Sequence, residues 1–495
     1  MLAASNQRRF KKIPASSWFI GLLALLVGAA ITFVVSQTEY ELWLLAAIGG
    51  GLFVLVLAFK PTWSLYILVF MTYTRLSDVL VNFHGAPSVA KVYIPLLLLL
   101  IIVRWVLYND EPQGLERTGI IIAYGLIGLA SILYAADPTR VNEALSDFIK
   151  DAIIVFVVIT LIHTGGTLRN VIWTLLAAGI FMGTISVYQQ LTGTFENPYW
   201  GFGVSNVANI VGESNAYRIG GPGLGPNTYA QFLLILVPLA LDRVWREQSR
   251  LGYFLAIYAL SVCILTIFFT FSRGAFIGLV IVLTIMFIYR PPRPRYILFT
   301  VLLGLLLIRF LPSQYTARVL TLGELVPGSQ DENVDDSSFR GRISENTSAW
   351  LMFNDHPILG VGLNNFKYHY QSYSRNIGLD PRREERSPHS LYLEFASELG
   401  VIGLIWLVAL QWITFRSLYQ ARRDFIAAQK SQYADIALAF GVGILSFLFT
   451  GIFLHVAHPR YLWLIYGIAL AMPHAARTEL ALYRNSQAVS AEKGV

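Results

Sequence analysis

The chain has 495 residues, of which 55% are hydrophobic and only 14% are charged. The mean hydropathy is +0.56, and the apolar residues fall in runs long enough to cross a membrane. This composition excludes a single soluble core and predicts a polytopic membrane protein. The net charge of +7 does not indicate nucleic-acid binding, because the basic residues lie in short loops between apolar runs.

Apolar length, bounded by turn residues and charges, predicts an all-α protein with about 12–14 transmembrane helices. The basic segment at 8–12 could begin a secretory signal, but no convincing cleavage site follows, so we interpret 17–36 as the first span. Short or polar-flanked segments could also be re-entrant. The candidate spans are 17–36, 40–59, 62–80, 90–107, 117–135, 146–163, 168–191, 227–244, 251–271, 274–290, 295–312, 389–415, 433–454 and 459–475.

The distribution of Lys and Arg predicts that both termini are cytoplasmic, because cytoplasmic loops carry the excess of these residues. With this orientation, the outer short loops hold only Arg75, Lys91, Arg140, Lys150, Arg218, Arg273 and Arg460. The expected organisation is an N-terminal transmembrane bundle (1–192), transmembrane helices with outer arginine loops (193–312), a large periplasmic loop subdomain (313–388), C-terminal transmembrane helices (389–475) and a cytoplasmic tail (476–495).

A glycine-rich loop follows Arg218, with the sequence Gly220-Gly221-Pro222-Gly223-Leu224-Gly225-Pro226-Asn227. The glycines exclude a regular helix, whereas the Pro-Asn pair can start one, so the pattern predicts a tight loop that leads into a helix N-terminus. Such a loop with an arginine can hold a phosphate, although an ordinary tight turn has the same pattern. It is not a P-loop, because no Gly-Lys-Ser/Thr follows.

Arg273 lies in Ser272-Arg273-Gly274-Ala275, at the mouth of a predicted hairpin of transmembrane helices. A snorkelling interfacial arginine and an anion-binding arginine both fit this position. The scarcity of arginines on the outer side favours anion binding. Arg342, placed just before a helix predicted over 344–354, is a further candidate cation, whereas most of the other arginines between positions 340 and 386 are expected to be solvated.

His389 and Ser390 follow a proline in a context typical of a helix start at the outer surface. The same helix carries Glu394 and Glu398, and a carboxylate at membrane depth indicates function. Nine positions separate His389 from Glu398, which places them on opposite sides of a helix, so we expect Glu398 to pair with an arginine of a neighbouring helix. Neither a metal site nor a cofactor is predicted, because the histidines lack metal-ligand spacing and the single Cys263 lies in an apolar run.

The pair His389-Ser390, followed after nine residues by Gly400-Val401-Ile402-Gly403, resembles the signature of the O-antigen ligase family within the O-antigen ligase and polymerase superfamily. The similarity extends over roughly residues 200 to 415 and includes the arginine loops and the turn at 356–362. It implies a fold similar to that of the C-type glycosyltransferases and metal-independent transfer of a glycan from an undecaprenyl-pyrophosphate carrier to an acceptor hydroxyl. The implied roles are a base for His389, pyrophosphate binding for Arg218, Arg273 and Arg342, and support for Glu398, Ser390 and Asn227.

The resemblance does not identify the acceptor of the glycan. An O-antigen ligase attaches the glycan to lipid A core, whereas an O-antigen or exopolysaccharide polymerase joins repeat units, and the spacing of the motif favours the ligase. A transporter or flippase for a lipid-linked glycan is an alternative of another class, although such folds tend to show inverted repeats and none is visible here. A membrane assembly subunit is a third interpretation. The resemblance implies a bacterial inner-membrane location, with the active site on the periplasmic face.

Overall fold

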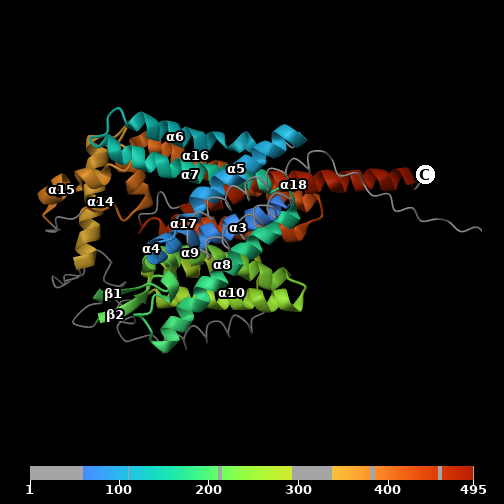
Figure 1. Ribbon diagram of the computed structural model, residues 1–495, viewed down its shortest axis with the longest axis horizontal. Helices are drawn as coiled ribbons and strands as arrows, with labels where there is room; N and C mark the ends of the chain where they lie inside the picture. The colour runs from blue at the N-terminus through green and yellow to red at the C-terminus, as the bar shows by residue number, and fades with distance from the viewer. Residues whose placement is uncertain are drawn as a thin grey trace, which may run out of the picture.

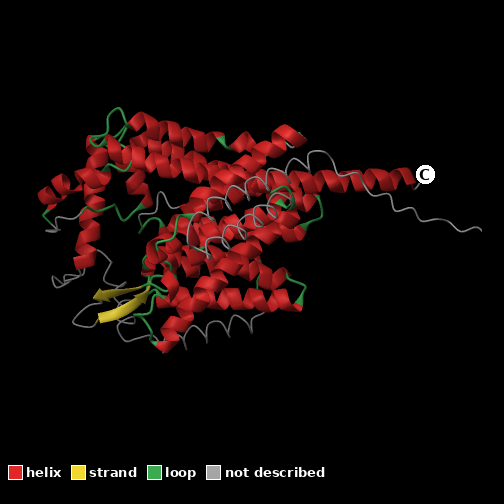
Figure 2. Ribbon diagram, viewed as in Figure 1, coloured by secondary structure: helices red, strands yellow, loops and turns green. Residues whose placement is uncertain are grey.

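The computed structural model describes residues 60–109, 111–209, 215–291, 337–378, 385–454 and 460–493. The predicted spans 17–36, 40–59 and 295–312 lie outside these residues. Within them the protein is almost entirely helical, with one pair of strands (Figure 2). The all-α prediction is therefore confirmed, apart from this small hairpin.

The first described helices are α3 (Pro61–Tyr73) and α4 (Leu76–His84), which form a pair bent by 54° where one span was predicted. The break lies at Arg75, whose φ of 55° is in the left-handed region and ends the first helix. After the bend come α5 (Val89–Tyr108), η1 (Leu115–Arg117), α6 (Gly119–Ser131), α7 (Pro138–Leu161) and α8 (Gly165–Thr192). Asp137 and Thr164 cap α7 and α8 with their side-chain oxygens, which fixes where these helices begin.

The polar stretch before the glycine loop contains a hairpin that the sequence did not predict. After η2 (Tyr199–Gly201), β1 (Ser205–Asn209) pairs with β2 (Asn215–Ile219) in antiparallel register, with Ser205 opposite Ile219. The glycine loop then leads into α9 (Pro226–Arg246), which has proline in its first turn, as predicted. Two further helices follow, α10 (Arg250–Phe269) and α11 (Arg273–Tyr289).

The C-terminal part contains α14 (Ser337–Asp355), α15 (Phe366–Ile377), α16 (Leu391–Ala427), α17 (Ser431–Thr450) and α18 (Arg460–Lys493). Helix α14 begins earlier than the predicted 344–354, so Arg342 lies within the helix and not before it. Helices α14 and α15 enclose a small apolar core of their own, built around Met352 and Phe366. Figure 1 shows α14, α15 and the strands at one end of the molecule and the C-terminus at the other.

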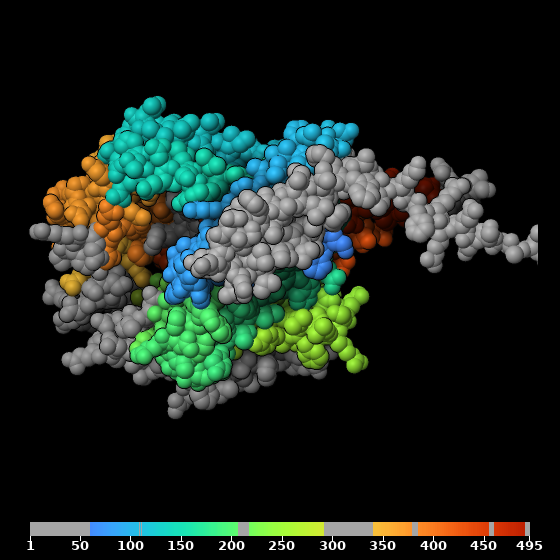
Figure 3. Space-filling model, in the orientation of Figure 1, coloured from blue at the N-terminus to red at the C-terminus, as the bar shows by residue number. Residues whose placement is uncertain are grey.

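Six described helices are long and apolar enough to cross a membrane, or seven if the bent α3–α4 pair counts as one span. The six are α5, α8, α9, α10, α16 and α17, and they confirm the spans predicted there; α6, α7, α11 and α18 occupy four other predicted spans. The protein is thus a multi-pass membrane protein. Helix α9 is the most enclosed of the six, since 83% of its apolar window is buried. The space-filling view shows α4, in blue, between the teal α6–α7 pair and the green segment near residue 200 (Figure 3).

Candidate functional site

Arg218 connects three segments at the end of the bundle that carries the strands. It lies on β2, and its Nε donates to the carbonyl oxygen of Thr270 at 2.9 Å. Its Nη2 donates to Oδ1 of Asn227, also at 2.9 Å. Thr270 follows α10, and Asn227 lies in the first turn of α9. The two bonds fix the plane of the guanidinium beside the start of α9, so the structure brings together Arg218 and Asn227, the residues at the two ends of the predicted glycine-rich loop.

Arg273 is the first residue of α11 and lies three positions after Thr270, the residue that accepts from Arg218. The intervening Phe271 has a φ of 52°, so the chain turns sharply between α10 and α11. The N-termini of α9 and α11 consequently lie on either side of Arg218. Because the first turn of a helix presents unpaired N–H groups and partial positive charge, two such ends next to two half-buried arginines have the chemistry to hold an anion.

His389 is held by a carboxylate that the sequence analysis did not find. Its Nδ1 contacts Oε2 of Glu345, and Nη1 of Arg386 donates to Oε1 of the same side chain at 2.8 Å. Glu345 lies on α14 and is completely buried, whereas His389 and Arg386 are partly exposed. Arg386 is therefore an arginine of this segment that is paired with a buried carboxylate and not simply solvated. Nothing in the local sequence pairs residues 44 positions apart, so only the packing of α14 against α16 could reveal this contact.

The charge state of Glu345 determines which nitrogen of His389 is available. Burial by itself raises the pKa of Glu345, but the hydrogen bonds and charges of His389 and Arg386 more than offset burial and hold this pKa below its usual value of 4.5. An ionised carboxylate only accepts hydrogen bonds, so Nδ1 of His389 must donate to it. In the neutral ring Nε2 is then the acceptor, which is the form that a general base requires.

Ser390 and Arg342 lie beside this pair with different roles. Ser390 caps α16, because its Oγ accepts from the backbone N–H of Leu393 at 3.5 Å, and it thereby fixes where the chain leaves His389 and becomes helical. Arg342 is half-buried on α14, one turn before Glu345, so the two residues share a face of that helix. The structure thus places a third candidate cation next to the His389 cluster.

Helix α16 is broken at Gly400, and the turn at 357–362 packs into the break. Gly400 has φ 62° and ψ −155°, a conformation that is essentially restricted to glycine. The backbone groups freed there are paired by the turn, since Val401 N donates to Pro357 O at 2.8 Å and Gly362 N donates to Glu398 O at 2.9 Å. A Cβ on Gly360 would lie 2.3 Å from the carbonyl carbon of Glu398, so the close approach requires glycine.

Within the described residues, Glu398 pairs with backbone amides and with no arginine, contrary to our expectation. Its Oε2 accepts from the backbone N–H of Asn364 at 2.8 Å, and its Oε1 accepts from that of Phe366 at 3.3 Å. Phe366 is the first residue of α15, so Glu398 caps that helix from within α16. Helical spacing correctly separated Glu398 from His389, but it could not show that backbone amides of a distant turn would reach the carboxylate.

The C-terminal end of α17 lies between the arginine cluster, which consists of Arg218 and Arg273, and the His389 cluster, which consists of His389, Glu345 and Arg386. On one side, the methyl group of Thr450 would lie 3.1 Å from a Cβ on Gly278 of α11. On the other side, Leu391 N donates to Gly451 O at 2.7 Å, two residues after His389. The starts of α11 and α16 thus flank the same helix end. Within the described residues, no group of three or more His, Cys, Asp or Glu side chains could hold a metal ion.

Residues 257–408 match the family model described as O-antigen ligase. The chain carries an O-antigen ligase domain. The ligase domain includes Arg273, Arg342 and His389, whereas Arg218 and Asn227 precede it. No curated protein matches the chain. This domain supports a glycosyltransferase of the ligase and polymerase type, a family that in general takes a lipid-linked glycan donor and an acceptor.

Proposed function

We propose that the protein transfers a glycan from an undecaprenyl-pyrophosphate carrier to an acceptor hydroxyl. The observation that supports this most is His389, oriented by the buried Glu345 at the end of the bundle where α9 and α11 begin beside Arg218 and Arg273. Such a transfer needs a base for the acceptor and positive charge for the leaving group. Both kinds of group flank the end of α17.

In the proposed step, Nε2 of neutral His389 takes the proton of the acceptor hydroxyl as its oxygen attacks the anomeric carbon of the donor. The bond between that carbon and the pyrophosphate oxygen breaks, and its electron pair stays on the pyrophosphate. Arg218 and Arg273 stabilise the charge that develops there, with Arg342 as a third cation, so we propose that no metal ion takes part. General-base assistance of this kind is worth about 10²–10⁴-fold.

The preferred acceptor is lipid A core, which makes the protein an O-antigen ligase, with repeat-unit polymerisation as the alternative on the same donor. An apolar cavity of about 480 Å³ beside the turn at 357–362 supports a lipid-linked substrate. Ile358 and Leu359 line it and are 67% and 46% exposed. Apolar side chains exposed in this way suit contact with a lipid chain. We further propose that the site faces the periplasm from the inner membrane and that both termini are cytoplasmic.

The test is product analysis with the purified protein in lipid vesicles. Undecaprenyl-pyrophosphate glycan is supplied with lipid A core or with a second glycan, and mass spectrometry identifies the product. We expect His389→Ala and Arg273→Ala to insert normally and to lose turnover, whereas the controls His84→Ala and Arg423→Ala retain it. Wild-type turnover by His389→Ala or Arg273→Ala would contradict the assigned roles. Movement of the donor across the membrane without a new product would instead indicate a flippase.

A further inference from the structure

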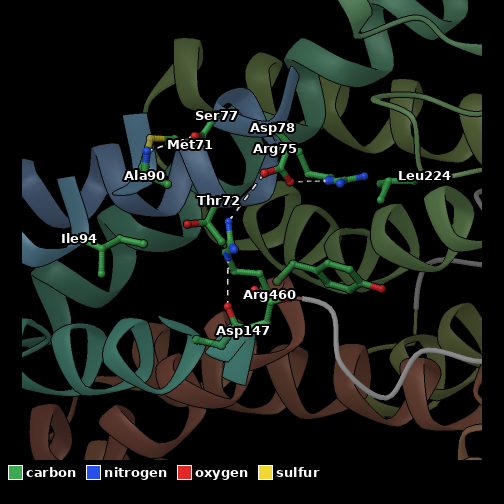
Figure 4. A pocket seen from close by; sticks show the side chains of 12 residues that line it. Met71, Thr72, Arg75, Ser77, Asp78, Ala90, Ile94, Asp147, Leu224 and Arg460 are labelled. Atoms are coloured by element: carbon green, nitrogen blue, oxygen red, sulfur yellow. Dashed lines mark hydrogen bonds and ion pairs between the residues drawn. The ribbon is translucent and has the colours of Figure 1, made fainter. Parts of the chain in front are cut away.

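A charged cavity of about 270 Å³ lies behind the glycine loop. Its walls come from the α3–α4 bend, the start of α5, α7 and the start of α18, and Leu224 of the glycine loop completes it. Figure 4 shows Arg460 in the middle of this cavity, between Asp78 and Asp147, with Leu224 on the far side of Arg75. The roles proposed above use none of these side chains.

Ion pairs link the walls of the cavity to the loop that follows Arg218. Nε of Arg460 donates to the buried Asp151 at 3.0 Å, and its Nη1 lies 3.8 Å from Asp78. Asp78 also accepts from Arg75 at 3.0 Å. Arg75 in turn donates to the carbonyl oxygen of Pro222 at 3.4 Å, within the glycine loop. The cavity therefore presents hydrogen-bond donors and acceptors in alternation, and it is mechanically joined to the loop between β2 and α9.

The charged walls of the cavity do not suit a prenyl chain, a pyrophosphate or a metal ion. A prenyl chain would bury the charged groups against hydrocarbon, which is costly. A pyrophosphate would meet three aspartates against two arginines. A metal ion would be repelled by the guanidinium of Arg460, which stands between the carboxylates. What remains is a compact, uncharged ligand with several hydroxyl groups.

We propose that this cavity binds one sugar ring of a glycan substrate, an inference that rests on the proposed glycan transfer. Carboxylates accept from sugar hydroxyls and guanidiniums donate to them, while Ile94 and Leu224 offer apolar contact for the C–H face of the ring. Tyr461 also lines the cavity, and its buried hydroxyl has no hydrogen-bond partner among the residues that the structure describes. Sugars of the donor and of the acceptor both carry such hydroxyl groups and C–H faces. The experiment below therefore determines which of the two substrates supplies the bound sugar.

The first measurement is saturation-transfer NMR on the full-length protein, with glucose, galactose, N-acetylglucosamine and rhamnose as the probes. We expect transfer to at least one of them, with an affinity weakened about tenfold or more in two variants. Ala90→Leu fills the cavity without removing a charge, and Thr72→Val exchanges a wall hydroxyl for a methyl at nearly constant shape. Ala130→Leu, an equal change on the exposed surface of α6, is the matched control. Because the two variants alter different properties of the wall, misfolding of one leaves the other as the test.

The proposal would be overturned if the wild-type protein showed no transfer, or if Ala90→Leu and Thr72→Val both showed the same transfer as wild type. The second measurement assigns the source in the vesicle assay. A rise of about tenfold in the apparent KM for the acceptor alone indicates the acceptor sugar, and the same rise for the donor alone indicates the donor sugar. Sugar binding does not require turnover. Activity that survives in His389→Ala would therefore refute the proposed base. Absence of saturation transfer in the wild-type protein, or transfer unchanged in both cavity variants, would refute only the sugar subsite.

Discussion

The substitution Glu345→Gln tests whether His389 acts as an oriented base. Glutamine keeps the shape of the buried side chain but removes its charge, and its amide can donate to Nδ1 of His389, which would place the proton on Nε2. Since general-base assistance is worth about 10²–10⁴-fold, we expect kcat to fall by about 10²-fold while the KM for the donor stays unchanged. A residue that only supports folding would not produce this split.

The same substitution has a predicted effect on stability that depends on pH. The lowered pKa of Glu345 means that the folded state favours the ionised carboxylate, so its contribution is present above the usual value of 4.5 and is lost as pH falls below it. A hydrogen bond to a charged group is worth about 1.5–3 kcal/mol, and the bond from Arg386 is of this kind. We therefore expect Glu345→Gln to be less stable than wild type near neutral pH, and the difference to shrink as the pH falls below the usual pKa of 4.5.

The assay compares initial rates of product formation, measured by mass spectrometry, with thermal unfolding of the same preparations. Glu385→Gln is the matched control, because Glu385 also pairs with an arginine, Arg140, but is 55% exposed and lies outside the cluster. We expect this control to behave as wild type and Glu345→Asp to recover part of the lost rate. A wild-type kcat in Glu345→Gln, in protein shown to be folded, would refute the orienting role.

Three further predictions concern other parts of the site. Arg218→Lys keeps the charge but loses the fork that bridges Thr270 and Asn227, so kcat/KM should fall about 10- to 100-fold; an unchanged value would show that charge alone suffices. Gly400→Ala should destabilise the protein by at least about 1–3 kcal/mol in thermal unfolding, because its Cβ would lie 2.4 Å from Ile358 O, whereas Gly119→Ala, which meets nothing within 4 Å, should not. Turnover should survive EDTA, and loss that added magnesium restores would contradict the metal-free step.

Much of the architecture is determined locally and is visible in the sequence. Apolar runs of membrane length at 168–191 and 433–454 predict helices that the structure shows as α8 (Gly165–Thr192) and α17 (Ser431–Thr450), because burial in lipid requires continuous apolar surface and internal hydrogen bonding. The glycine loop before Asn227 and the helix start after Ser390 are likewise determined locally, the first by the backbone freedom of glycine and the second by the Ser390 cap. The hairpin before the loop was missed, because its two short strands carry no clear alternation of apolar residues.

The sequence by itself determined which residue types gather at one end of the bundle, since span length, charge bias and motif spacing are properties of the chain read in order. Only the tertiary structure decided their partners. Glu345 meets His389 across 44 positions, and Glu398 meets the amides of the 364–366 turn, because α14 and the turn pack against α16. Long-range polar contacts of this kind depend on how helices are placed in space, and helical periodicity fixes only the direction in which a side chain leaves its own helix.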